Sequence, residues 1–207
     1  ERGVQMVAKP FAIGLRIEHP AAFIDETQYG REAARILPAA DYRLTHRHQG
    51  VGVYSFCMCP GGQVVCASSE PRRQVTNGMS RYARGSDQSN SAIVVGIEPD
   101  RWGLDSAMEA IAFQRHLEEA AYAAAGGGFL APAQSARDFL RRRLATHLPE
   151  TSYRPGVEPA MLEELLPPFV IAAIKAGLRR FDRIIPGFVD EGLLIGTETR
   201  TSSPVRL

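Results

Sequence analysis

Residues 11–18 read Phe-Ala-Ile-Gly-Leu-Arg-Ile-Glu, and from Ala12 onward apolar side chains alternate with other types. Because successive side chains of a strand point to opposite faces, this alternation predicts a β-strand with one apolar face. His19-Pro20 is expected to end the strand, and a short helix or loop is expected at 20–29. The apolar face comprises Ile13, Leu15 and Ile17, and the opposite face comprises Gly14, Arg16 and Glu18.

Further strand patterns fill the first half of the chain. Residues 51–59 alternate large and small side chains, and Pro60-Gly61-Gly62 supplies a tight turn, since proline fixes one φ and glycine permits a positive φ. Residues 63–69 then return as a strand, so the two segments are predicted to form a hairpin. Strands are also expected at 42–46 and 91–98. The connections are too short for helical crossovers, which favours antiparallel pairing.

The second half has helical patterns. Ser106 and Glu109 match a capping box, which predicts a helix that ends at Gly126-Gly127-Gly128. Further helices are expected at 135–144, 159–166 and 169–181, and a last strand is expected at 193–199.

This order of elements predicts an α+β fold. The core is expected to be a mostly antiparallel β-sheet, or a barrel-like variant of it, with a helical lobe at about residues 104–185. Residues 1–207 are interpreted as one domain, β-rich over 1–100 and 188–207 and helical over 101–187.

Composition narrows the class of protein. Hydrophobic residues make up 44% and charged residues 23%, as in ordinary globular proteins, and no apolar run approaches the roughly 20 residues of a membrane helix. The formal net charge of +1 gives no global attraction to nucleic acid. Three cysteines without a signal pattern favour a reducing cytoplasm over a disulfide framework. Glu1 at the start also favours an excised domain or a processed product over a whole gene product.

Cys57 and Cys59 lie two residues apart on the strand at 51–59 and invite a metal or redox interpretation. A structural zinc site needs four ligands at wider spacing, so no metal site is predicted. The favoured interpretation is that small residues here let a flat group approach the sheet.

Two other places suggest binding. Residues 76–80, Thr-Asn-Gly-Met-Ser, are predicted as a loop, either an ordinary turn or a binding loop. Arg16 is a candidate substrate anchor and His19 a candidate proton donor or acceptor; alternatively, Arg16 and Glu18 form only a surface salt bridge. The chain has no Gly-x-Gly-x-x-Gly fingerprint, Walker lysine motif or Gly-x-Ser-x-Gly elbow, so neither dinucleotide binding nor triad chemistry has support.

Residues 198–206, Glu-Thr-Arg-Thr-Ser-Ser-Pro-Val-Arg, place arginines around a run of hydroxyl side chains. Arginine presents a planar fork of donors that suits carboxylate, phosphate or a polar ring edge. The segment therefore indicates the edge of a site that continues beyond this chain.

Five motifs of the chain are residues 9–20, 54–62, 76–80, 131–134 and 198–206. Together they resemble the uncharacterised bacterial FAD-dependent dehydrogenases of the "FAD-dependent protein C" group. The resemblance spans essentially the whole chain. It implies that residues 1–207 are the substrate or cap domain inserted into an FAD-binding domain of the same polypeptide, and that residues 1 and 207 lie close together.

The resemblance also implies a cofactor and site residues. FAD would bind in the full-length protein, and the isolated fragment would be inactive because it lacks the glycine fingerprint. The implied function is to cover the flavin ring and bind a small-molecule substrate. Arg16, His19 and Arg200 are the catalytic candidates. The flavin-facing candidates are Cys57, Cys59, Gly61, Asn77, Thr201, Ser202 and Arg206.

The alternative function is a non-catalytic module that binds an anionic small molecule, RNA or a protein partner. The near-zero net charge and the lack of an aromatic and basic stripe argue against nucleic acid. No membrane or nucleic-acid partner is expected.

Overall fold

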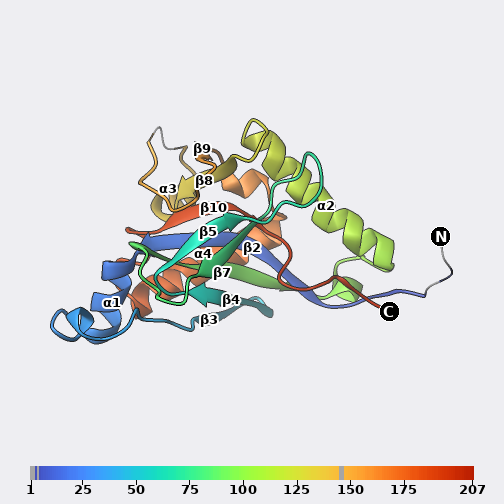
Figure 1. Cartoon of the computed structure of the whole chain (residues 1–207). Coiled ribbons are helices and arrows are strands. Elements are labelled where there is room, and N and C mark those ends of the chain that lie inside the picture. Colours follow the sequence, from blue (N-terminus) through green and yellow to red (C-terminus); the bar gives the residue numbers. More distant parts are fainter. Residues whose placement is uncertain (1–2, 4, 145–146) are drawn as a thin grey trace.

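The structure is a computed structural model that describes residues 3, 5–144 and 147–207. Four α-helices and three short 3-10 helices accompany eleven strands in the described residues (Figure 1). The strands are β1 (Val7–Ala8), β2 (Phe11–Pro20), β3 (Thr45–His48), β4 (Val51–Cys59), β5 (Gly62–Cys66), β6 (Thr76–Ser80), β7 (Gln88–Ile97), β8 (Ala131–Ser135), β9 (Val157–Pro159), β10 (Leu193–Glu198) and β11 (Val205–Arg206). The helices are α1 (Ala21–Tyr29), η1 (Ala33–Arg35), η2 (Pro99–Arg101), α2 (Ala107–Ala124), α3 (Ala136–Arg141), η3 (Leu162–Glu164) and α4 (Pro168–Ile184).

Seven strands form the main sheet in the order β3-β4-β7-β2-β10-β8-β9. All neighbours pair antiparallel except β8 and β9, which pair parallel. The α+β prediction is confirmed. Of the two expected cores, the open sheet is present, and within the described residues it does not close into a barrel, because β3 and β9 remain its edges.

One face of the sheet packs on α4 and carries the main core. Ile13, Leu15 and Ile17 of β2 lie on this face, as the alternation predicted, and are fully buried. Gly177 of α4 lets the helix approach β4 closely, since a Cβ there would lie 3.0 Å from both methyl groups of Val53. This first face therefore fixes the sheet rigidly on its helix.

The second face, opposite α4, is only partly covered. The two-stranded sheet of β5 and β6 lies over it; Figure 1 shows β5 in front of the main sheet and α4 behind. The cover explains why β2 is buried on both faces from Phe11 to His19, although the alternation predicted polar side chains on this face. Arg16 and Glu18 are thus buried polar groups.

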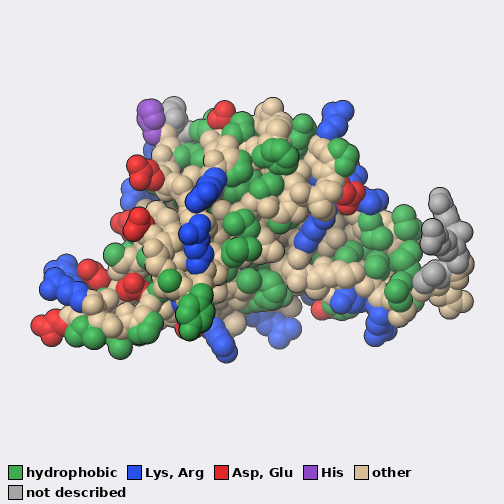
Figure 2. Space-filling view, viewed as in Figure 1, with side chains coloured by type: hydrophobic (Ala, Val, Ile, Leu, Met, Phe, Trp, Pro, Cys, Tyr) green, Lys and Arg blue, Asp and Glu red, His purple; other side chains and the backbone are tan. Residues whose placement is uncertain are grey.

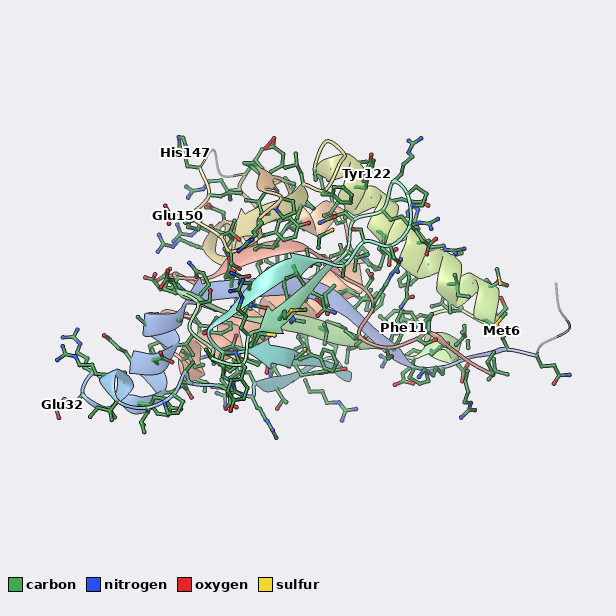
Figure 3. The ribbon with its side chains drawn as sticks, in the orientation of Figure 1. Met6, Phe11, Glu32, Tyr122, His147 and Glu150 are labelled. Carbon is green, nitrogen blue, oxygen red and sulfur yellow. The ribbon has the colours of Figure 1, made fainter. Side chains whose placement is uncertain are left out.

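The first and last strands of the described chain lie side by side. β1 pairs antiparallel with β11, with Val7 opposite Arg206 and Ala8 opposite Val205. Residue 1 lies outside the described residues, so its expected proximity to residue 207 stays a prediction. Figure 3 shows that Phe11, next to this pair, lies far from Glu32 near the opposite end of the molecule.

Two predictions for residues 60–80 are wrong. The expected hairpin of 51–59 with 63–69 does not form, because β4 is irregular between Phe56 and Cys59 and β5 instead pairs with β6. Residues 76–80 are therefore strand β6 and not a loop. The turn predicted at Pro60-Gly61 is present. The strand that follows it, β5, nevertheless pairs with β6 and not with β4.

The second half shows one confirmed cap and several shifted elements. Ser106 and Glu109 form the predicted capping box of α2. The helix expected at 159–166 is wrong, since only the single turn η3 forms there after β9. The strand expected at 42–46 begins later, at Thr45. Two unpredicted strands, β8 and β9, join the main sheet from within the mostly helical stretch.

Surface chemistry is mixed on the face shown in Figure 2, where Lys and Arg side chains are scattered among other types. Within the described residues, none of the helices combines the length and apolar character that crossing a bilayer requires.

Candidate functional site

The uncovered end of the second face forms a cavity with a floor of small residues. Ala12 of β2 lies opposite Gly96 of β7. Gly52 lies on β4, two residues before Tyr54, which pairs with Val94 of β7. A Cβ added at Gly52 or Gly96 would meet no heavy atom within 4 Å. The backbone is therefore accessible to a flat group, which is the kind of approach that the sequence predicted near Cys57.

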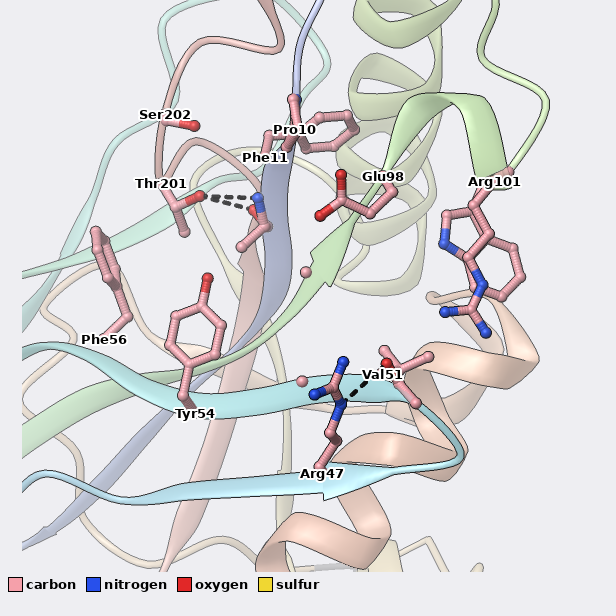
Figure 4. Close-up of a pocket in the computed structure, with 15 residues that line it drawn as sticks. Pro10, Phe11, Arg47, Val51, Tyr54, Phe56, Glu98, Arg101, Thr201 and Ser202 are labelled. Carbon is pink, nitrogen blue, oxygen red and sulfur yellow. Dashed lines mark hydrogen bonds between the residues drawn. The ribbon is translucent and has the colours of Figure 1, made fainter.

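The cavity has a volume of about 530 Å³ (Figure 4). Its walls come from the starts of β2 and β4, the ends of β3 and β7, the segment 99–102 and the segment after β10. Several lining residues, including Arg47, Glu98 and Arg101, are exposed, so the cavity opens to solvent. The lining residues are Pro10, Phe11, Ala12, Arg47, Gly50, Val51, Gly52, Tyr54, Phe56, Gly96, Glu98, Arg101, Trp102, Thr201 and Ser202.

Polar groups are arranged around this floor. Thr201 is fixed by two hydrogen bonds: its hydroxyl accepts from the Ala12 N–H at 3.3 Å and donates to the Ala12 carbonyl at 2.8 Å. Tyr54 points its hydroxyl into the cavity (Figure 4). Partial burial raises the pKa of this phenol. Tyr54 is therefore a neutral hydrogen-bonding group at neutral pH.

Arg16 lies further along the second face, beneath β6, with none of its surface exposed. Its terminal nitrogens donate to the Cys57 carbonyl at 3.1 and 3.3 Å and to Asn77 Oδ1 at 3.3 Å. Gly78 is required above it, because a Cβ there would overlap the Arg16 guanidinium. The structure thus brings together the predicted residues Arg16, Cys57 and Asn77, but does so inside the protein.

Glu198 is the counter-ion of Arg16. Its Oε2 lies 3.6 Å from Arg16 Nε, and both side chains are essentially buried. Burial raises the pKa of Glu198 to about 7, and the Arg16 charge offsets this shift only in part. Arg16 therefore does not pair with Glu18, whose carboxylate instead accepts from Thr151 and Ser152.

The Arg16 cluster also contains buried polar atoms without a hydrogen-bond partner among the described residues: Arg16 Nε, Glu198 Oε2 and both side-chain polar atoms of Asn90. Such atoms are costly unless water reaches them. The Arg16 cluster adjoins the cavity at Phe56, which lines the cavity while its carbonyl lies 3.5 Å from Arg16 Nη1.

His19 lies on the first face, away from Arg16. Its ring packs against Phe23 and Phe188, and Nε2 lies 2.8 Å from the Phe188 carbonyl. Burial lowers the pKa of His19 to about 4, so the ring is neutral at neutral pH. This geometry favours a packing role, and proton exchange with a substrate stays a prediction.

Arg200 lies in a third place, beside α2. It donates to both carboxylate oxygens of Glu118, at 2.8 and 2.7 Å, and Glu118 is fully buried. Thr199 donates to the same carboxylate at 2.7 Å. Arg200 therefore neutralises a buried charge that joins α2 to the end of β10.

The flavin-facing candidates are dispersed. Of these, Thr201 and Ser202 line the cavity. Cys57 is exposed beside a smaller hollow and Cys59 is buried. Gly61 has φ +48° and packs against the backbone of Arg84, and Arg206 lies in β11. In the described residues no group of three or more His, Cys, Asp or Glu side chains could hold a metal ion.

Sequence reasoning missed most of the cavity. Arg47 and the residues Glu98, Arg101 and Trp102 come from two separate segments that only the pairing of β3, β4 and β7 brings together. The available signal was the pair of glycines inside strands, Gly52 and Gly96, since glycine within a strand often marks the close approach of another group.

Comparisons with known proteins show the family of this chain. A model of the family described as "FAD-dependent protein, C-terminal domain-like" matches residues 10–201. A protein of Clostridium beijerinckii, described as an uncharacterised protein, is 48% identical over 210 residues. The alignment covers 99% of this chain and 39% of the relative, so the chain spans about two fifths of the relative's length.

Proposed function

The chain belongs to the FAD-dependent protein, C-terminal domain-like family, and from this premise we propose that it is the substrate-binding or cap domain of an FAD-dependent oxidoreductase. In this role the cavity faces the flavin ring held by another domain of the same polypeptide. The observation that carries the proposal is the flat, open floor of Ala12, Gly52 and Gly96.

The position of the cavity supports this arrangement. Pro10 and Thr201, the limits of the family match, both line the cavity. β1 and β11 pair next to these residues. The relative carries additional sequence, and such sequence joined beyond β1 or β11 would leave the domain from the end that holds the cavity.

The lining residues fit a planar cofactor edge or a substrate held beneath it. The hydroxyls of Tyr54, Thr201 and Ser202 supply donors and acceptors at the walls. When bound, FAD supplies the redox chemistry, and protein groups orient the substrate and exclude water. Thr201 and Ser202 keep the flavin-facing role expected of them, and Tyr54 joins them. Without the FAD-binding domain, this chain is expected to have no redox activity.

Energy transfer from tryptophan to flavin tests the proposal. Trp102 is the single tryptophan of the chain and lines the cavity. In the full-length protein with FAD bound, excitation of Trp102 should produce flavin emission by energy transfer. Trp102→Phe should remove most of the flavin emission that comes from this residue. Phenylalanine at this position can preserve the stacking on Phe169.

A matched control places the donor elsewhere. The double variant Trp102→Phe/Tyr29→Trp carries its tryptophan on α1, at the end of the molecule opposite the cavity (Figure 1). Transfer from position 29 should be much weaker than from position 102. Equal transfer from the two positions would contradict the proposal and would favour the alternative of a binding module that does not cover the flavin.

A further inference from the structure

The cavity has a charge distribution that the proposed function leaves unexplained. Its charged lining residues are Arg47 of β3, Arg101 of η2 and Glu98 between β7 and η2. Among the described residues, none of these three side chains forms an ion pair within 4.0 Å. Two guanidinium groups and one carboxylate thus line one cavity, and none of them is held in an ion pair by another described residue.

Both guanidinium groups lie near the β3–β4 turn. Arg47 Nε donates to the Gly50 carbonyl at 3.4 Å. A Cβ built on Gly50 would lie 3.8 Å and 3.9 Å from the two terminal nitrogens of Arg101. Both side chains therefore lie close to Gly50, and Figure 4 shows Arg47 and Arg101 among the residues that line the cavity.

Arg101 packs on an aromatic side chain, Trp102. Its Cζ lies 5.4 Å from the centre of the Trp102 ring, and Trp102 stacks on Phe169 of α4 at 3.5 Å with an interplanar angle of 7°. Stacking of this kind restricts the aromatic platform on which the cation lies. The guanidinium donors are thus held at the cavity by packing rather than by an ion pair.

We propose that the cavity binds a small organic acid, with the carboxylate between Arg47 and Arg101 and a planar body between the flavin ring and the floor at Gly52 and Gly96. This inference rests on the proposed function and names its substrate class. A planar guanidinium matches a carboxylate with paired hydrogen bonds. Two arginines and one glutamate give the lining a formal net charge of +1, which a single carboxylate neutralises and a phosphate dianion would exceed.

Fluorescence of Trp102 in this 207-residue chain provides the test, because the chain has one tryptophan. The probes are benzoate, its neutral counterpart benzamide, and phenyl phosphate. Benzoate should change the Trp102 emission saturably, with at least about tenfold higher affinity than benzamide, since hydrogen bonds to a charged group are the stronger ones. Phenyl phosphate should bind more weakly than benzoate.

Variants locate the binding site. The double variant Arg47→Gln/Arg101→Gln should lower benzoate affinity about tenfold or more while leaving benzamide affinity unchanged. Gly96→Leu should abolish binding of both, since the new side chain enters open space in the cavity. Arg180→Gln, at an exposed position of α4, is the matched control and should bind benzoate like the unchanged chain.

Equal affinities for benzoate and benzamide, no binding of either, or unchanged benzoate affinity in the double variant would overturn the assignment. Tighter binding of phenyl phosphate would overturn the carboxylate choice. These outcomes are separate from those of the proposed function: weak tryptophan-to-flavin transfer with selective benzoate binding rejects the flavin-facing role alone, and strong transfer without benzoate selectivity rejects the substrate class alone.

Discussion

Glu198 and His19 are buried titratable groups whose pKa values move in opposite directions. The pKa of Glu198 rises from 4.5 to about 7, so its stabilising contribution is present below pH 4.5 and is lost as the pH rises through 7. The pKa of His19 falls from 6.5 to about 4, so its contribution is present above pH 6.5 and is lost as the pH falls through 4. The two effects largely cancel between these limits.

Single substitutions should expose each effect. Glu198→Gln leaves the His19 effect without its opposing partner, so the free energy of unfolding should increase with pH between about 4 and 6.5, by roughly 3 kcal/mol or less. In His19→Gln it should decrease between about 4.5 and 7 by a similar amount. Urea unfolding at several pH values measures both slopes. Slopes of the same sign in the two variants would contradict the assigned pKa shifts.

Arg200 and Arg206 provide a second contrast between residues. Arg200→Ala leaves the buried Glu118 carboxylate without its cation, and the free energy of unfolding should fall by about 3–5 kcal/mol. Arg206→Ala, at an exposed position of β11, should change it by less than about 0.5 kcal/mol. Denaturant unfolding compares the two variants. If Arg200→Ala were as stable as Arg206→Ala, Arg200 would not be needed to neutralise Glu118, and only its candidate role in binding would remain.

The turn between β4 and β5 depends on the backbone at Gly61. Its φ is +48°, and a Cβ there would overlap the backbone carbonyl of Arg84. We expect Gly61→Ala to lower the free energy of unfolding by about 1–3 kcal/mol, because this backbone cannot shift without disturbing β7 through the Gly61–Ser89 hydrogen bond. Gly52→Ala, where a Cβ meets open space, is the control and should be nearly neutral.

Local patterns predicted the elements that local forces determine. The alternation of residues 11–18 predicted β2, and the Ser106 and Glu109 capping box predicted the start of α2. β6 was unpredictable by the same reasoning, since residues 76–80 carry Asn-Gly, a strong turn signal, and become a strand only by pairing with β5. Tertiary pairing overrides weak local preference in such segments.

The same limit applies to the candidate site. Thr201 and Ser202 were predictable because polar side chains concentrate in one segment near the end of the chain. Arg47 and Arg101 were not, since more than fifty residues separate them in sequence and only the sheet brings them to Gly50. Arg16 was identified, but its burial under Gly78 depends on the β5–β6 cover that the sequence did not predict.

Thr201 joins the returning segment after β10 to the start of β2, far apart in the chain. Thr201→Val removes both hydrogen bonds to Ala12 and should lower the free energy of unfolding by about 1–2 kcal/mol. Benzoate affinity should fall as well, because the cavity wall loosens. Thr201→Ser keeps the hydroxyl and should retain both properties; loss of benzoate binding in that variant would show that the threonine methyl group, and not the hydrogen bonds, forms the wall.

We propose that the second face of the sheet, at the end where β1 pairs with β11, covers the flavin. In an experimental structure of the full-length protein with FAD bound, the flavin ring should lie over the floor of Ala12, Gly52 and Gly96, with Thr201 and Tyr54 at its edge. A flavin ring over α4, beside α1 or otherwise away from this cavity would rule the proposal out.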